Sequence, residues 1–171
     1  MAQLKRVELA QYATQPFATF RAAPVIVAQS EGRANAMTIG WGGLGTLWSI
    51  PVSTTYVRTS RFTHQLMSCS SLYSICWLPE SMKDAVALCG KESGRDMDKL
   101  AACGLTLAHT EEGVPYVKQS EIVIANRKIH AAPIDMLGFC KDGMHDRWYQ
   151  PGTANSPHVT FIGEVLGVWQ A

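Results

Sequence analysis

Short runs of apolar and β-branched residues alternate with polar, turn-forming residues along most of the chain. Between residues 52 and 58, for example, Thr alternates with Val and Tyr, which is the pattern of a half-buried strand. A turn-like sequence at residues 30–33 separates the first two of these runs. The strands predicted on this basis are residues 24–29, 36–41, 52–58, 72–77, 120–129 and 159–169.

Three short stretches have helical patterns instead. Residues 60–67 contain few helix breakers and begin with Ser60, a good N-cap residue. Residues 79–90 begin with Pro79, which suits the first helical position, and end at Gly90. The third predicted helix is residues 96–103, with acidic residues in its first turn, and the polar residues 141–156 are predicted to be a loop.

Many short strands with a few short helices predict a mainly β fold, a β-barrel with helical insertions. A chain of 171 residues has the length of one domain, so we expect a single domain over residues 1–171. No internal repeat or low-complexity linker divides it.

The composition is that of an ordinary globular protein, with 47% hydrophobic and 17% charged residues. The net charge of +1 argues against a broad electrostatic surface for nucleic acid or membranes. No apolar run approaches the roughly 18 residues of a membrane-spanning helix, and the N-terminal residues have no signal-peptide core behind them. We therefore expect a cytoplasmic protein with no nucleic-acid or membrane partner.

The five cysteines are irregularly spaced and include no C-x-x-C pair. Metal sites and redox dithiols require tighter clusters, so we expect neither, and free buried thiols are the favoured interpretation. The histidines form no cluster, and each is expected to be an ordinary surface or partly buried imidazole. They are His64, His109, His130, His145 and His158.

Two arginines and two hydroxyls gather where the strand at 52–58 meets the helix at 60–67. Arginine pairs two phosphate oxygens at once, and a helix N-terminus adds free N–H groups and a positive dipole end. The junction therefore predicts a phosphate site, although a solvated helix start with two exposed arginines would have the same pattern. The residues are Arg58, Ser60, Arg61 and Thr63.

The sequence GWGGLG at residues 40–45 matches the dinucleotide fingerprint G-x-G-x-x-G literally. That fingerprint must begin a helix and be followed about 20 residues later by an acid. Here Pro51 and a strand follow, and no Asp or Glu lies between Glu31 and Glu80, so the match is coincidental. We expect these glycines to let the backbone approach a flat ligand closely.

Taken together, the motifs resemble those of the flavin reductase-like family of FMN-binding split β-barrels, which includes the flavoredoxins. Four motifs occur in the family's order and span most of the chain. They are NAMTIGWG at 35–42 with WSIP at 48–51, VRTSRFT at 57–63, CGKESGRDMDK at 89–99 and HVTFIGEV at 158–165. One departure is Pro157, where relatives often have an acidic residue before the histidine, so no role is assigned to His158.

The resemblance implies a split β-barrel that binds FMN near a homodimer interface. It implies that Trp41 is a flavin neighbour, that Asn35, Met37 and Thr38 line the ring or ribityl chain, and that Lys99 reaches the cofactor. A cation near the ring would raise its reduction potential. The alternatives are core positions for Trp41 and Trp48, the latter left as wall or core, and a solvated helix surface for Lys99. The adenylate half of FAD would need further contacts that the sequence does not locate.

The function expected from the resemblance is reduction of flavin by NADH or NADPH, with electrons passed to a free flavin, oxygen or a protein acceptor. No catalytic side chain is expected, because hydride moves directly to the flavin. The alternatives are a flavoredoxin-like FMN electron carrier that does not oxidise NAD(P)H itself, or a flavin-binding module without turnover.

Overall fold

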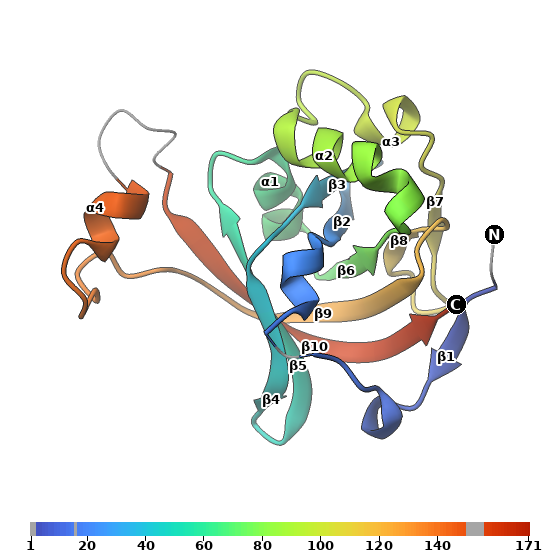
Figure 1. Cartoon of the computed structure of the whole chain (residues 1–171), viewed down its shortest axis with the longest axis horizontal. Coiled ribbons are helices and arrows are strands. Elements are labelled where there is room, and N and C mark those ends of the chain that lie inside the picture. Colours follow the sequence, from blue (N-terminus) through green and yellow to red (C-terminus); the bar gives the residue numbers. More distant parts are fainter. Residues whose placement is uncertain (1–2, 16, 150–155) are drawn as a thin grey trace.

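One antiparallel sheet of eight strands forms most of the protein in a computed structural model (Figure 1), which describes residues 3–15, 17–149 and 156–171. A separate hairpin, β7–β8, packs beside it. The strands are β1 (Lys5–Val7), β2 (Val25–Ser30), β3 (Arg33–Thr38), β4 (Gly42–Leu47), β5 (Ile50–Arg58), β6 (Leu72–Trp77), β7 (Leu107–His109), β8 (Pro115–Val117), β9 (Ile122–Pro133) and β10 (His158–Gln170).

The helices are short and lie in the connections. Three 3₁₀ turns, at Leu9–Gln11, Thr19–Ala22 and Glu80–Met82, accompany them. The α-helices are α1 (Phe62–Cys69), α2 (Lys83–Lys91), α3 (Lys99–Ala102) and α4 (Met144–Tyr149).

The strands follow the order β3-β2-β6-β9-β10-β5-β4, and β1 adds to the far end of β10. In the described part of the chain β3 and β4 are the two edges and do not pair with each other, so the barrel is split between them. The chain crosses this split directly, because only residues 39–41 connect β3 to β4.

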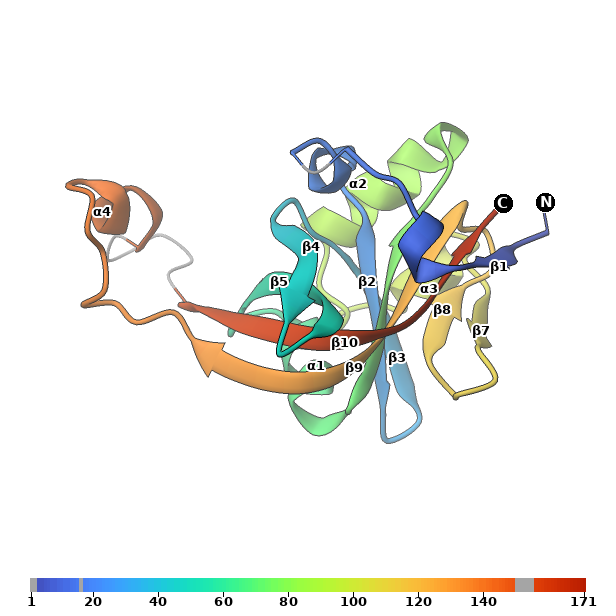
Figure 2. The same ribbon diagram turned by 90° about the horizontal axis from the view of Figure 1, so that it is seen from below.

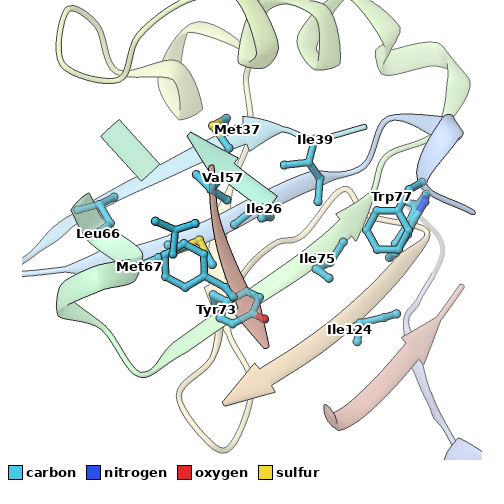
Figure 3. Close-up of a cluster of buried hydrophobic side chains, with 14 of the residues drawn as sticks. Ile26, Met37, Ile39, Val57, Leu66, Met67, Tyr73, Ile75, Trp77 and Ile124 are labelled. Carbon is cyan, nitrogen blue, oxygen red and sulfur yellow. The ribbon is translucent and has the colours of Figure 1, made fainter. Parts of the chain in front are cut away.

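The strand β2 shows how both faces of the sheet become buried. Its residues Val25–Ala28 have no exposed surface, and they alternate between two hydrophobic clusters. Ile26 and Ala28 face the barrel interior with Tyr73 and Ile124, part of the cluster drawn in Figure 3. Val25 and Val27 face the cluster that α2 and α3 cover. Burial on both faces explains why this strand has a continuous apolar run.

A polar network lies inside the barrel. Ser53 donates to Asn126 Oδ1 (2.8 Å) and lies 3.3 Å from the Tyr73 hydroxyl, whose pKa burial raises to about 12. Gly163 makes room for this network, because a Cβ there would lie 2.8 Å from Asn126 Cβ and also meet the Tyr73 hydroxyl. Asn126 Nδ2 also donates to the Ile124 carbonyl (2.9 Å), so both ends of this buried amide have partners.

The strands β9 and β10 extend beyond the barrel as a hairpin arm, with α4 at its far end (Figures 1 and 2). The arm segment is the described part of the connection, residues 134–149 and 156–157. The arm segment contacts Arg58 at the end of β5 and Ser60 just after it.

The six predicted strands are all present, within a few residues of the predicted ends. The sequence missed β4, because three of its six residues are glycine, and the three-residue strands β1, β7 and β8. The predicted loop at 141–156 was wrong over α4, whose residues Trp148 and Tyr149 pack as aromatic side chains. Residues 150–155 lie outside the described part of the chain.

The predicted helix ends needed correction. Arg61, not Ser60, is the N-cap of α1, and neither residue's side chain caps the helix. Residues 80–82 form a 3₁₀ turn before α2, which continues one residue past Gly90. Of residues 96–103 only α3 is helical, and Asp98 Oδ1 caps it by accepting from the Ala101 N–H (3.1 Å).

The cysteines are free, but the prediction that they are buried is correct for only some of them. Cys76 and Cys89 are buried, whereas Cys69 and Cys140 are exposed. Burial raises the pKa of Cys89 to about 12. Within the described residues no group of three or more His, Cys, Asp or Glu side chains could hold a metal ion, and no helix is both long and apolar enough to cross a membrane.

Candidate cofactor site

A cavity of about 350 Å³ lies where β3, the end of β5, the start of α1 and the connection from α2 to α3 meet. Its walls come from four segments that are distant in the sequence. Seven of the nine predicted cofactor residues line it, namely Asn35, Met37, Arg58, Ser60, Arg61, Thr63 and Lys99. Its other lining residues are Phe62, Glu92, Ser93 and Gly94, which lie within the motifs at 57–63 and 89–99.

Two predicted residues bond to each other at the base of this cavity. Asn35 on β3 and Thr63 in the first turn of α1 are both buried, and Asn35 Nδ2 donates to Thr63 Oγ1 (2.7 Å). The Asn35 Oδ1 atom lies beside Gly94, where any side chain would collide with it. The Asn35 side chain therefore holds the start of α1 against β3, and both Asn35 and Thr63 line the cavity.

The two arginines come to the same cavity because the chain turns tightly between them. The Arg61 N–H donates to the Arg58 carbonyl (3.0 Å), which reverses the chain from β5 into α1. The first N–H groups of a helix have no partner within the helix. This junction therefore presents two guanidiniums and free backbone donors together, as a phosphate group requires.

Arg58 also holds the arm segment in place. Its Nη2 donates to the Trp148 carbonyl and its Nη1 to the Ser156 carbonyl, both at 3.3 Å, and it lies 5.6 Å from the Tyr149 ring centroid. Ser156 Oγ accepts from the Ser60 N–H (3.0 Å) and donates to Ser60 Oγ (2.6 Å). Arg58 and Ser60 thus serve both the cavity and the arm segment.

Lys99 is buried, with 3% of its surface exposed, which excludes the solvated helix surface considered from the sequence. Its Nζ donates to the carbonyls of Cys89 (2.9 Å) and Glu92 (3.3 Å) at the C-terminal end of α2. Burial lowers the pKa of Lys99, and the nearby Arg61 cation lowers it further, while the Cys89 thiol opposes the shift. An ammonium has three donors, so one remains beyond these two carbonyls.

A second hollow, of about 190 Å³, adjoins the first and shares Met37, Arg58 and Arg61 with it. The two other predicted residues, Thr38 and Trp41, line this hollow, and Trp41 is 45% exposed rather than part of the core. All nine predicted residues therefore border one continuous region. The remaining lining residues are Ile39, Gly40, Tyr56 and His158.

His158 was given no role from the sequence, yet it lines the second hollow. It is 5% exposed, its Nδ1 lies 2.7 Å from the Tyr149 hydroxyl, and its ring centroid lies 5.1 Å from that of Trp41. Burial, with the Arg58 guanidinium as a smaller cause, lowers the pKa of His158 to about 4. The position follows from the register that pairs it with Arg58 across β10 and β5, which no single-sequence signal shows.

The structure contradicts a core position for Trp48, whereas the prediction that the glycines of residues 40–45 let the backbone approach a flat ligand stays a prediction. Trp48 is neither wall nor core, because it is 69% exposed at the turn between β4 and β5 and lines neither hollow. The glycines of residues 40–45 do not line a flat cavity as a group. Gly42 instead packs under the Phe20 ring, and Gly40 alone borders the second hollow.

Cationic side chains line both hollows of the site, because Arg58 and Arg61 border each of them. Arg58, Arg61 and Lys99 face the first cavity against a single lining carboxylate, Glu92. Met37, shared by both hollows, leads to the Trp41 side. This donor set fits a ligand with an anionic phosphate and a flat, largely apolar ring, which is the chemistry of a flavin mononucleotide.

The sequence pattern of the family described as flavin reductase like domain matches residues 18–171. This chain belongs to that family. No curated protein matches the chain.

Solved structures with the same fold include proteins named for flavin. A flavoredoxin from Methanosarcina acetivorans is 18% identical with a TM-score of 0.68, over 87% of this chain and 68% of that one. An FMN-binding protein from Thermus thermophilus, solved with p-hydroxybenzaldehyde, is 23% identical with a TM-score of 0.67, over 98% and 82%. A flavoredoxin of Desulfovibrio vulgaris is 21% identical with a TM-score of 0.68, over 98% and 76%. The predicted fold class, a mainly β split barrel, is confirmed.

Proposed function

We propose that the chain binds FMN and acts as a flavin reductase-like oxidoreductase. The supporting observation is the cavity in which two arginines, two hydroxyls and a buried lysine come together, beside a second hollow that Met37 and Trp41 line. Family membership and the FMN-binding protein of the same fold agree with this proposal.

In this proposal Arg58, Ser60 and Arg61 hold the phosphate, with the backbone N–H groups at the start of α1. Met37, Thr38 and Trp41 flank the ring, and Asn35 and Thr63 fix the distance between β3 and α1. A flavin held by these residues would supply the redox chemistry, as an acceptor of hydride. Lys99 places a positive charge beside the cavity, which favours the reduced and more negatively charged cofactor.

The electron donor in this proposal is NADH or NADPH, and the acceptor is a free flavin, oxygen or a protein. The alternative is a flavoredoxin-like carrier that a partner protein reduces, or a flavin-binding module without turnover. The flavoredoxins of the same fold favour the carrier among these alternatives.

One pair of measurements separates the reductase from the other two functions. The protein is first titrated with FMN, and uptake of about one equivalent per chain is expected. Stopped-flow mixing of the loaded protein with NADH and with NADPH then follows the flavin absorbance. Rapid bleaching supports a reductase, and bleaching by dithionite alone supports a carrier or module. No FMN uptake would disprove the proposal itself.

We also propose that the protein is a cytoplasmic homodimer. The proposal of a dimer rests on the resemblance to the family, whose flavins lie near a subunit interface. The proposal of a cytoplasmic location rests on the five free cysteines, because thiols stay reduced in the cytoplasm. Sedimentation equilibrium tests the first point, with twice the chain mass of 18.7 kDa expected and a monomer contradicting it.

A further inference from the structure

Two cysteines that are distant in the sequence lie together where α2 and α3 cover the sheet. Cys103, just after α3, has its Sγ 3.8 Å from the Ala85 carbonyl of α2. In an α-helix that carbonyl also accepts from the N–H of the residue four positions on, which is Cys89. The Cys103 thiol therefore lies against the turn of α2 that contains Cys89, and the two thiols hydrogen bond to each other. The sequence predicted no redox dithiol, because this contact depends on how the helices pack.

The two thiols differ in how solvent reaches them. Cys103 is partly exposed, whereas Cys89 has no exposed surface. Burial raises the pKa of Cys89, and the adjacent Cys103 thiol raises it further, so Cys89 stays protonated at neutral pH. A reagent in solution therefore reacts with Cys103 first, and Cys89 is in position to react with the product.

Lys99 lies beside the buried member of the pair. Its Nζ donates to the Cys89 carbonyl (2.9 Å), and its positive charge lowers the pKa of the Cys89 thiol, against the effect of burial. A neighbouring cation stabilises a thiolate. Lys99 therefore favours loss of the Cys89 proton at the moment when that sulfur attacks its neighbour.

The segment between the two cysteines forms one wall of the cofactor cavity. Four of its residues line the cavity, namely Glu92, Ser93, Gly94 and Lys99. A bond between Cys89 and Cys103 would close this segment into a loop. The oxidation state of the two thiols would then act directly on the wall of the site.

We propose that Cys89 and Cys103 form a reversible disulfide when the protein reacts with a peroxide, and that this bond holds the cavity wall at residues 92–99 in place. The inference goes beyond the proposed flavin function and does not depend on it. Disulfides of cytoplasmic proteins are usually transient and often sense the redox state, which suits a bond that forms and is reduced again.

The chemistry balances with hydrogen peroxide as the oxidant. The Cys103 thiolate attacks one peroxide oxygen, the O–O bond breaks, and hydroxide leaves from a sulfenic acid. The Cys89 sulfur then attacks the Cys103 sulfur, so an S–S bond forms, the S–O bond breaks, and the departing hydroxide takes the Cys89 proton as water. Two thiols lose two electrons to one peroxide, and two waters form. A dithiol such as dithiothreitol reverses the reaction by exchange.

The test begins from a variant without the two exposed cysteines, Cys69→Ser/Cys140→Ser, so that only buried and partly exposed thiols remain. Cys103→Ser in this background removes the thiol that reacts first. Cys76→Ala is the matched control, because it removes a buried cysteine of the same hydrophobic cluster and leaves the pair intact. Each protein is treated with hydrogen peroxide, its free thiols are blocked with iodoacetamide, and it is digested with trypsin.

Trypsin separates the two cysteines, because it cleaves after lysine and arginine. Cys89 is then in the peptide of residues 84–91 and Cys103 in that of residues 100–118. Mass spectrometry should find these two peptides joined in the background protein and in the Cys76→Ala variant. Dithiothreitol should separate them, and Cys103→Ser should not form the joined species.

Two physical measurements follow the effect on the protein. Without reductant, oxidation should raise the unfolding temperature by on the order of 5 °C, because a cross-link restricts the unfolded chain. Amide hydrogen exchange of residues 92–98 should slow severalfold on oxidation, since the segment opens less often once it is closed into a loop. Neither change should occur in Cys103→Ser.

Two results would overturn the disulfide. One is recovery of Cys103 as sulfinic or sulfonic acid with no joined peptides, and the other is a cross-link only between chains, which a non-reducing gel detects. Unchanged hydrogen exchange in the cross-linked protein would overturn the effect on the cavity wall. Failure of the protein to bind FMN would disprove the proposed flavin site and leave all of these results decisive for the disulfide.

Discussion

Arg61 is the residue whose substitution best separates phosphate recognition from support of the fold. Within the described residues Arg61, unlike Arg58, makes no hydrogen bond to the arm segment, and it lines both hollows. Arg61→Met should weaken FMN by roughly 1.5–3 kcal/mol, about tenfold to a hundredfold, and leave riboflavin nearly unchanged, because only FMN has the phosphate. Isothermal titration with both ligands measures this, and an equal loss for the two would contradict a phosphate role.

Lys99 is expected to affect both stability and redox potential. Lys99→Met leaves the carbonyls of Cys89 and Glu92 without this donor, at a cost of about 1–3 kcal/mol in the free energy of unfolding. It also removes a positive charge beside the cavity, so the midpoint potential of bound FMN should fall by tens of millivolts, ~30 mV per 1.4 kcal/mol.

Lys91→Met is the matched control for Lys99, since that side chain is 85% exposed at the end of the same helix. Spectroelectrochemical titration and urea unfolding are done on both variants. A loss of stability without a change in potential would make Lys99 a support of α2 and remove it from the cofactor site.

His158 should make stability depend on pH. Its folded pKa of about 4 lies below the usual unfolded value of about 6.5, so the unfolded state binds more protons between these values. The stabilisation is therefore fully present above about pH 6.5 and is lost as the pH falls toward 4, by up to about 3 kcal/mol. Urea unfolding of wild type and His158→Gln across this range tests it, and His130→Gln is the control. Parallel pH profiles would show that His158 is not responsible.

At the scale of residues, the sequence predicted which side chains line the candidate site but not the hydrogen bonds and strand register that position them. The arginines and hydroxyls of the β5–α1 junction are close in sequence, so one motif was enough to find them. Lys99 also lines the cavity, but its two carbonyl bonds depend on how α2 ends against α3. The location of His158 depends on strand register, which a single sequence does not specify.

Between elements, the packing of β10 against side chains of β6 and β9 depends on Gly163. Gly163→Ala should lower the free energy of unfolding by about 1–3 kcal/mol, because its Cβ would meet the Tyr73 hydroxyl and Asn126. Adding Tyr73→Phe removes one of the two clashing groups and should restore part of the loss. Gly43→Ala on β4, where nothing lies within 4 Å, should be neutral. Equal stability of Gly163→Ala and Gly43→Ala in urea would contradict the packing argument.

Element types were easier to predict than element ends. Strands with apolar, β-branched runs were found, since burial of side chains selects those residues. The strand β4 was missed because it is rich in glycine, which has low strand propensity. This strand forms because it pairs with β5. α4 was missed because a six-residue helix in a polar, Gly-containing segment has little local signal, and its aromatic contacts with Trp41 and His158 are long-range.

For the molecule as a whole, the sequence predicted a mainly β barrel but not its strand order. The order places β9 and β10 in the middle of the sheet, although they are the last two strands in the chain. The β4–β5 hairpin joins the other strands only through β10, which pairs with β5 on one side and β9 on the other. Pairings between such distant segments are not visible as local patterns.

This central position of β10 has a consequence for biosynthesis. On the ribosome β10 emerges after all other strands, so until then β5 has only β4 as a partner and the barrel cannot close. Closure must therefore wait until β10 is available, and pairings between distant strands form slowly and leave apolar strands exposed meanwhile. A chain that ends at residue 156 should be degraded readily by protease, whereas the chain through residue 171 should resist, and pulse proteolysis of the two chains measures the difference. Resistance of the shorter chain would mean that the remaining strands close without β10, which would then be an addition to a finished barrel.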